Sequence, residues 1–206
     1  MENIIKNLAI TMCLLLSFST LAQVKVLVLG DSLSEGYGVG KEYSYVTLIQ
    51  NRLDKEKVNI KITNGSISGS TTSSLSSRLR WYLKTKPDYV IVALGANDGL
   101  RGVDISTIEK NLKSGIDEIK KVNATALLFP MLLPPNYGEV YRKGFEKVFT
   151  DIIKQSNLEK LPFLLDGVAG ERSLNQSDGI HPNIKGHELI AEKLYPIFKR
   201  LGHVKN

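Results

Sequence analysis

The chain has 206 residues, a net charge of +6 at pH 7 and one cysteine, Cys13. The length suits one domain with a substantial core, and because Cys13 lies in an apolar N-terminal segment, the remainder has no disulfide framework, thiol nucleophile or zinc–thiolate site. Lys and Arg are scattered among acidic residues, without the basic, aromatic-interleaved run of a nucleic-acid groove. The charge therefore predicts no nucleic-acid partner, although it is compatible with attraction to anionic membranes or substrates.

Residues 1–22 have the composition of a secretory leader. A positive charge precedes the apolar run Leu8–Leu21, and Thr20 and Ala22 are small residues at the two positions that a signal peptidase reads. The run is short and contains several hydroxyl side chains, which disfavours a retained membrane anchor. We expect cleavage after Ala22, a periplasmic or secreted protein without a stable membrane span, and a single domain over residues 23–206.

Apolar runs alternate with segments of helical periodicity along the rest of the chain. In chain order these are a strand at Val24–Leu29, a helix at Tyr45–Leu53, a strand at Val58–Thr63, a helix at Ser70–Lys86, a strand at Tyr89–Leu94, a helix over 105–119, a strand at Ala124–Leu132, a helix over 145–152, a brief strand at Phe163–Leu165 and a helix over 190–201. Strands with unbroken apolar sequence are typical of a sheet covered on both faces. The pattern predicts an α/β domain in which a parallel sheet lies between helical layers.

Polar clusters fall where these strands end. Gly30-Asp31-Ser32 follows the first strand, 64–69 follows the second, 95–98 follows the third, and 178–181 precedes the last helix. Ligands of such sheets bind beyond the carboxyl ends of the strands, so we expect the four clusters to meet at one rim.

Histidine is the candidate base for a hydroxyl nucleophile. His203 is close to the C-terminus, and His187, within the predicted final helix, is expected to be a solvated surface residue. His181 follows Asp178 by three residues and precedes Pro182, which favours an extended turn in place of a helix. In that turn the carboxylate can contact one ring nitrogen and leave the other for a nucleophile. Alone, such a pair is more often a surface turn or a helix cap.

Ser32 is the candidate nucleophile, because it lies at a turn directly after a buried strand. Its backbone N–H, the backbone N–H of Gly69 and the side-chain amide of Asn97 can together form an oxyanion hole. Taken singly, Gly69 is more readily explained as a turn residue and Asn97 as a loop cap. Asp31 is expected to be structural, since its side chain points away from that of Ser32 on a tight turn.

Taken together, Gly30-Asp31-Ser32-Leu33-Ser34, Gly69, Gly95-x-Asn97-Asp98 and Asp178-x-x-His181-Pro182 resemble the four ordered blocks of the SGNH, or GDSL-type, hydrolase family. The resemblance extends from about Val24 to Leu201. It implies that Ser32 is the nucleophile, that His181 is the general base oriented by Asp178, and that Ser32, Gly69 and Asn97 form the oxyanion hole. It also implies a flavodoxin-like three-layer α/β/α sandwich with a five-stranded parallel sheet.

Three further segments resemble the bacterial periplasmic thioesterase, lysophospholipase and arylesterase group of that family, namely 64–69, 99–102 and 133–138. The resemblance implies a serine esterase that cleaves carboxylic esters or thioesters of small molecules or lipids through an acyl-enzyme on Ser32. It also implies that an acyl groove runs beside the segments after the third and fourth strands. The candidate groove residues are Leu33, Leu100, Pro134 and Tyr137.

Other hydrolytic and nucleotide-binding patterns are absent. The glycines of 36–40 fail the phosphate-loop spacing, and no Gly-x-Ser-x-Gly elbow is present. Three scattered histidines give no metal-ligand pattern, so neither a metal nor a cofactor is predicted. Two alternatives remain: a carbohydrate O-deacetylase with the same residues, and a non-catalytic module that binds lipids or glycans outside the cell.

Overall fold

The computed structural model describes residues 22–203. The predicted leader therefore lies outside the described residues, apart from Ala22. Within residues 22–203, no helix has both the length and the apolar character needed to span a bilayer.

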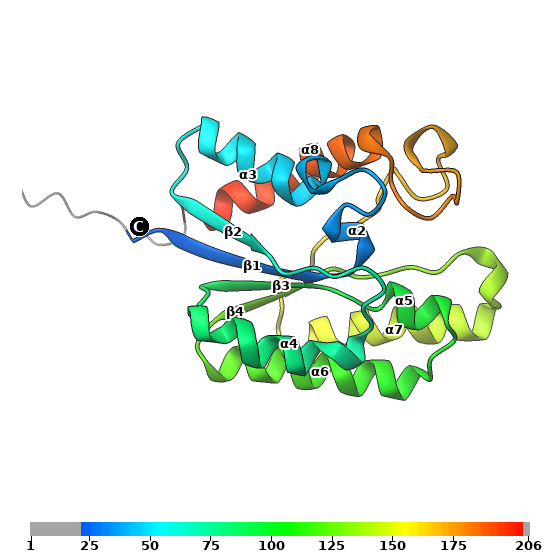
Figure 1. Cartoon of the computed structure of the whole chain (residues 1–206). Coiled ribbons are helices and arrows are strands. Elements are labelled where there is room, and N and C mark those ends of the chain that lie inside the picture. The colour runs from blue at the N-terminus through cyan, green and yellow to red at the C-terminus, as the bar shows by residue number, and fades with distance from the viewer. Residues whose placement is uncertain (1–21, 204–206) are drawn as a thin grey trace, which may run out of the picture.

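Four parallel strands form one sheet in the order β2-β1-β3-β4. They are β1 (Val24–Gly30), β2 (Ile60–Asn64), β3 (Tyr89–Ala93) and β4 (Thr125–Leu128). The helices are α2 (Ser32–Glu35), α3 (Tyr45–Lys55), α4 (Leu75–Tyr82), α5 (Ala96–Leu100), α6 (Ile105–Lys121), α7 (Glu139–Gln155) and α8 (Ile184–Leu201). Helices α3 and α8 cover one face of the sheet and α4, α6 and α7 the other, which confirms the three-layer α/β/α fold (Figure 1).

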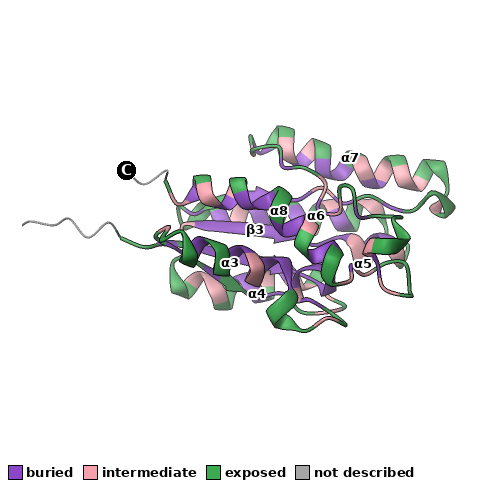
Figure 2. Ribbon diagram, turned by 90° about the horizontal axis from the view of Figure 1, so that it is seen from above, coloured by how far each residue is buried: buried purple, intermediate pink, exposed green. Residues whose placement is uncertain are grey.

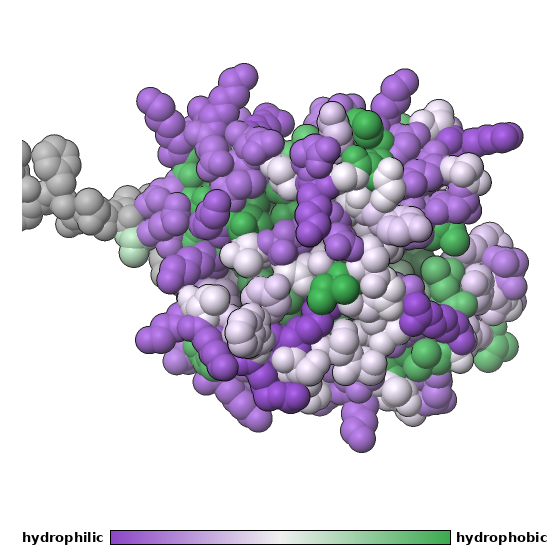
Figure 3. All heavy atoms as spheres, viewed as in Figure 1, coloured by the Kyte–Doolittle hydropathy of each residue, from purple (hydrophilic) through white to green (hydrophobic). Residues whose placement is uncertain are grey.

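The two central strands explain why the core forms here. Every residue of β3 is buried, and in β1 only Lys25 is exposed. Figure 2 shows this purple sheet between helices whose outer sides are exposed. Each large aliphatic side chain buried in this way contributes about 1.5–3 kcal/mol to folding. On the face drawn in Figure 3, hydrophilic side chains dominate and hydrophobic ones form small, separate patches.

The helices begin at polar side chains that accept backbone N–H groups. Ser44 accepts from Thr47 at the start of α3, Asp104 starts α6, and Asn183 accepts from Gly186 at the start of α8. Such caps stabilise a helix by about 1 kcal/mol each. The apolar stripe of α6, predicted from its spacing, is buried against the sheet and α4.

The expected fifth strand at Phe163–Leu165 is wrong, and the sheet has four strands. Beside β4 the chain makes only an isolated bridge between Leu128 and Lys160, and Phe163 and Leu165 then lie in turns closed by Asp166 and Val168. The apolar side chains of this segment line a pocket instead, so their hydrophobicity does not report strand pairing.

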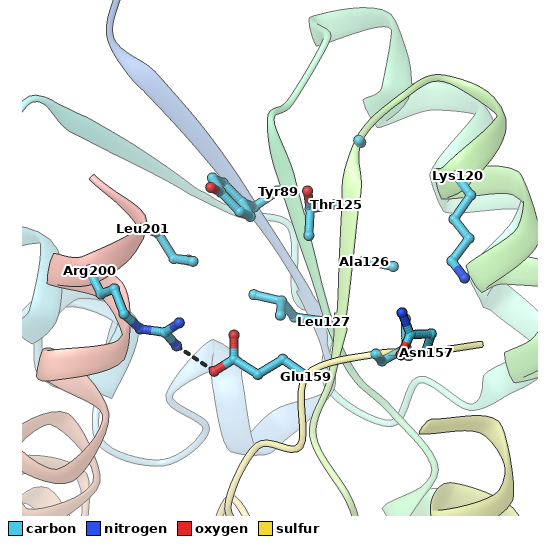
Figure 4. Close-up of a pocket in the computed structure, with 11 residues that line it drawn as sticks. Tyr89, Lys120, Thr125, Ala126, Leu127, Asn157, Glu159, Arg200 and Leu201 are labelled. Carbon is cyan, nitrogen blue, oxygen red and sulfur yellow. Dashed lines mark hydrogen bonds and ion pairs between the residues drawn. The ribbon is translucent and has the colours of Figure 1, made fainter. Parts of the chain in front are cut away.

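The space beside β4 is a hollow of about 430 Å³ near the amino ends of the strands (Figure 4), and no residue of the polar clusters lines it. Glu159 and Arg200 form an ion pair across it.

The predicted helix Ser70–Lys86 is also shorter than expected: α4 is flanked by single 3-10 turns at Thr72–Ser74 and Leu83–Thr85.

Candidate active site

Ser32 opens α2 at the carboxyl end of β1. The preceding Asp31 caps this short helix, because its Oδ1 accepts the backbone N–H of Leu33 at 3.0 Å. Asp31 is buried, and Ser32 as a residue is only 9% exposed. Burial raises the pKa of Asp31 to about 6, against the lowering effect of hydrogen bonds from Leu33 and Asn97.

His181 joins Ser32 to Asp178. The Nε2 atom of His181 is 2.9 Å from Ser32 Oγ, and its Nδ1 atom is 2.7 Å from Asp178 Oδ2. The other carboxylate oxygen of Asp178 accepts the backbone N–H groups of Ile180 and His181. Partial desolvation opposes ionisation of Asp178, but these hydrogen bonds and the nearby ring lower its pKa to about 2. The arrangement has the geometry of a nucleophile, a base and a carboxylate that orients the base.

Gly69 and Asn97 lie beside the Ser32 turn. The Asn97 amide donates to Ser70 O at 3.1 Å and to Asp31 Oδ2 at 3.3 Å, which links the segment after β2 to the segment after β1. Gly69 has a φ of +75°, a conformation that favours glycine. The sequence-predicted oxyanion donors are therefore brought to the same rim as Ser32.

Arg101 was not singled out from the sequence, yet it bridges the two predicted oxyanion donors outside Ser32. Its Nη2 atom donates to Asn97 Oδ1 at 3.4 Å and to Gly69 O at 3.3 Å. By accepting the guanidinium, Asn97 Oδ1 fixes the orientation of the amide, so that its N–H groups face Ser70 O and Asp31 Oδ2. Arg101 lies one helical turn after Asn97, a spacing that could have pointed to this contact.

Tyr37 and Arg78 also support the site and were missed. The Tyr37 ring packs on His181 with centroids 4.8 Å apart. Arg78 is buried in α4, and its Nη2 donates to Gly30 O at 3.0 Å and to Gly65 O, which ties the carboxyl ends of β1 and β2 together. Neither residue belongs to a recognisable motif, so only the fold reveals these contacts.

The expectation that His187 is a solvated surface residue is wrong. It is 1% exposed, and its Nδ1 atom accepts the backbone N–H of Tyr45 at the start of α3. Burial, followed by the charge of His181, lowers the pKa of His187 to about 4. A signal was available in the sequence, because His187 lies three residues before Ile190 and seven before Leu194, on the buried stripe of the helix.

An apolar pocket of about 380 Å³ opens beside Ser32. Three of the four candidate groove residues line it, namely Leu33, Leu100 and Pro134. Its walls are completed by Ala96, Leu132, Leu133, Pro135, Phe163, Leu165, Ala169, Gly170, Gly179 and Ile180. The fourth candidate, Tyr137, lies outside the lining and donates its hydroxyl to Leu100 O at 3.1 Å. Among residues 22–203, no group of three or more His, Cys, Asp or Glu side chains is arranged to hold a metal ion.

The sequence pattern of the GDSL-like Lipase/Acylhydrolase family matches residues 28–189. The chain belongs to this family. It is 37% identical to the esterase TesA of Pseudomonas aeruginosa, over 85% of this chain and 88% of that one. It is 36% identical to thioesterase 1/protease 1/lysophospholipase L1 of Escherichia coli strain K12, over 86% and 85% of the two chains.

The fold agrees with this assignment. The crystal structure of the psychrotrophic esterase EstA from Pseudoalteromonas sp., inhibited by monoethylphosphonate, superposes with a TM-score of 0.82 at 37% identity, over 85% of this chain and 97% of that one. The protein is a serine ester hydrolase of the GDSL-like family, and small-molecule esters are its class of substrate.

Proposed function

We propose that Ser32 is the nucleophile of this hydrolase, with His181 as general base and Asp178 as the group that orients the base. The observation that carries the proposal is the continuous hydrogen-bonded line from Asp178 through His181 to Ser32 Oγ. Its two distances lie within the range in which a proton is transferred between side chains.

In the proposed reaction, Ser32 Oγ attacks the carbonyl carbon of the substrate while His181 Nε2 takes its proton. Negative charge on the carbonyl oxygen is stabilised by the backbone N–H groups of Ser32 and Gly69 and by the amide of Asn97. His181 then protonates the leaving group, which departs and leaves an acyl group on Ser32. Water, deprotonated by His181, releases the acid and restores the hydroxyl.

The apolar pocket supports acyl esters or thioesters as substrates. Its walls are almost entirely aliphatic, aromatic or proline side chains, which suit a hydrocarbon chain better than a sugar. The names of the relatives, an esterase and a thioesterase/lysophospholipase, agree with this choice. We assign Leu33, Leu100 and Pro134 to the acyl-binding wall.

We also propose that the protein acts in the periplasm or outside the cell, as a single domain over residues 23–206 after removal of the leader. The first strand begins at Val24, two residues after Ala22, so the proposed cleavage would remove no residue of the sheet. Mass spectrometry of the exported protein should find Gln23 as its first residue. An exported chain that still carries Met1 would contradict cleavage.

The test is hydrolysis of p-nitrophenyl esters from acetate to palmitate by the exported protein and by its Ser32→Ala and His181→Ala variants. His203→Ala is the matched control, because His203 is exposed and distant from the site. We expect both site variants to lose activity and the control to keep it. Activity confined to acetate would favour the O-deacetylase, and a folded protein inactive on every ester would favour the binding module.

A further inference from the structure

The amino ends of the strands form the end of the molecule opposite the active site. Helices α4 and α6 both finish there, just before β3 and β4, and pack side by side. Because Tyr89 of β3 pairs with Thr125 of β4, the segments that precede the two strands are also neighbours. The two helix ends and the start of β1 thus share one surface.

This surface combines an exposed tryptophan with lysines, and we call it the Trp–Lys patch. It comprises Lys25, Trp81, Lys84, Lys86, Lys121 and Val122, all of them exposed. Trp81 is 69% exposed and Val122 is 49% exposed. The Lys84 ammonium lies 5.2 Å from the centre of the Trp81 ring, and Lys25 Nζ donates to Thr85 O. The second of these contacts connects β1 to the 3-10 turn that follows α4.

Acidic side chains are sparse around the patch. Asp88 accepts the backbone N–H of Lys25, and Glu118 lies one turn back on α6. At the active-site rim, by contrast, charges of both signs are mixed: Glu35, Lys41, Glu42, Arg101, Asp104, Glu139, Lys143, Glu171, Arg172, Asp178 and Lys185. Elsewhere at this end, Glu56 and Glu159 are paired with Lys199 and Arg200, so positive charge prevails within the patch itself.

Tryptophan beside lysine is the combination that suits a lipid–water interface. The indole has an apolar body and a polar N–H, and lysine keeps its ammonium in the headgroup layer while its stem lies on apolar surface. Anionic headgroups attract such lysines within a Debye length of the surface. A helix end that contacts only solvent accounts for the lysines, but it does not account for an exposed indole.

We propose that the Trp–Lys patch docks the protein on anionic phospholipid surfaces, with Trp81 entering the headgroup layer and the lysines contacting lipid phosphates. The chain also enters the fold at this end, since β1 starts at Val24 next to the patch. During the proposed export, this end is the part of the fold nearest the membrane until the leader is removed. Docking in this orientation turns the active-site rim away from the bilayer.

Trp81 is the only tryptophan of the chain, so its fluorescence reports directly on the patch. The exported protein is mixed with vesicles of phosphatidylglycerol and phosphatidylcholine, and separately with vesicles of phosphatidylcholine alone. We expect a blue shift of the emission with the anionic vesicles only, and its reversal by salt. Vesicle binding without a change in Trp81 emission would place the contact elsewhere and overturn the proposal.

A pair of charge variants separates the patch from net charge. Lys84→Gln/Lys121→Gln removes two patch lysines, and Lys110→Gln/Lys185→Gln removes two exposed lysines outside it. We expect the first to weaken binding to anionic vesicles by roughly fivefold for each lysine, and the second to leave it unchanged. Circular dichroism shows that both variants are folded. Equal losses in the two variants, or binding to a nucleic acid but not to vesicles, would contradict lipid docking.

Discussion

The Nε2 atom of His181 lies 2.9 Å from the Oγ atom of Ser32, although the two residues are 149 positions apart in the chain. Their contact depends on two turns, one after β1 and one before α8. Asp178 sets the second turn, because one of its oxygens accepts two backbone N–H groups while the other holds the His181 ring.

Replacing Asp178 with Asn tests whether its two carboxylate oxygens have these separate roles. The amide can still accept the backbone N–H groups, but it favours the wrong tautomer of His181, so we expect kcat to fall by up to about 10⁴-fold. Asp117→Asn, in an exposed ion pair on α6, is the control and should keep full activity. A pre-steady-state burst distinguishes slow acylation from slow deacylation. An Asp178→Asn enzyme with normal kcat would refute the role of Asp178.

Loss of the Asn97 amide should remove one donor to the oxyanion. We expect Asn97→Ala to lower kcat by about 10²–10³-fold with a smaller change in KM, which is the usual size for one such donor. Asn51→Ala, at an exposed position in α3, should behave as wild type. An unchanged kcat in the Asn97 variant would exclude the residue from the oxyanion hole.

Arg101 should act through Asn97 and Gly69, since its guanidinium bonds to both. The side chain is exposed and the bonds are long, so we expect Arg101→Met to lower kcat only about two- to tenfold. Arg101→Lys should restore part of that loss. In the double variant with Asn97→Ala, the Arg101 change should cost less than it does alone, because only the bond to Gly69 O remains to be lost. Fully additive losses would show that the two residues act independently.

The pocket should measure acyl length. Each buried methylene contributes about 0.8 kcal/mol, so kcat/KM should rise roughly fourfold per carbon until the pocket is full. Leu165→Trp fills one wall and should abolish that rise for long esters while acetate hydrolysis persists. Val140→Trp, at an exposed position outside the lining, is the control. The same length profile in both variants would exclude the pocket as the acyl site.

His187 should make the protein sensitive to acid. Its pKa is lowered from 6.5 to about 4 in the fold, so the unfolded chain binds a proton that the native state rejects. Stability from this group is complete above pH 6.5 and is lost as the pH falls through about 4. Asp31 has the opposite effect on stability. Burial raises its pKa to about 6, so the free-energy cost of burying its charge disappears when the carboxylate is protonated.

Denaturant unfolding at about pH 7 and about pH 4 measures this effect. We expect His187→Gln to lose less stability between the two than wild type does, by up to about 3 kcal/mol. His203→Gln, which replaces an exposed histidine, should lose as much stability between the two pH values as wild type does. If wild type and His187→Gln lost the same stability between the two pH values, His187 would not titrate as its burial predicts.

The order of strands and helices was readable from the sequence because buried parallel strands such as Tyr89–Ala93 are continuously apolar. The same rule failed at Phe163–Leu165, where apolar side chains serve a pocket instead of a strand. An apolar sequence indicates that its side chains are shielded from solvent, but it does not indicate whether they belong to a strand or to the wall of a pocket.

The site shows a similar division. Ser32, Asp178 and His181 stand in short motifs that chemistry makes recognisable, and the fold brings them together as expected. Arg78 and Tyr37 act through contacts between segments distant in sequence, which no local pattern encodes. The polarity of histidine alone predicts a surface position for His187, whereas the position of His187 on the buried face of the helix determines its burial.

The positions of the proposed catalytic residues along the chain also determine when activity can arise during synthesis. Ser32 follows the first strand, whereas Asp178 and His181 are synthesised late, just before α8. A partly synthesised chain therefore carries the proposed nucleophile without its proposed base. Esterase activity cannot appear until nearly the whole polypeptide has been made. On the proposed export route, a chain that crosses the membrane unfolded would gain this activity only after translocation.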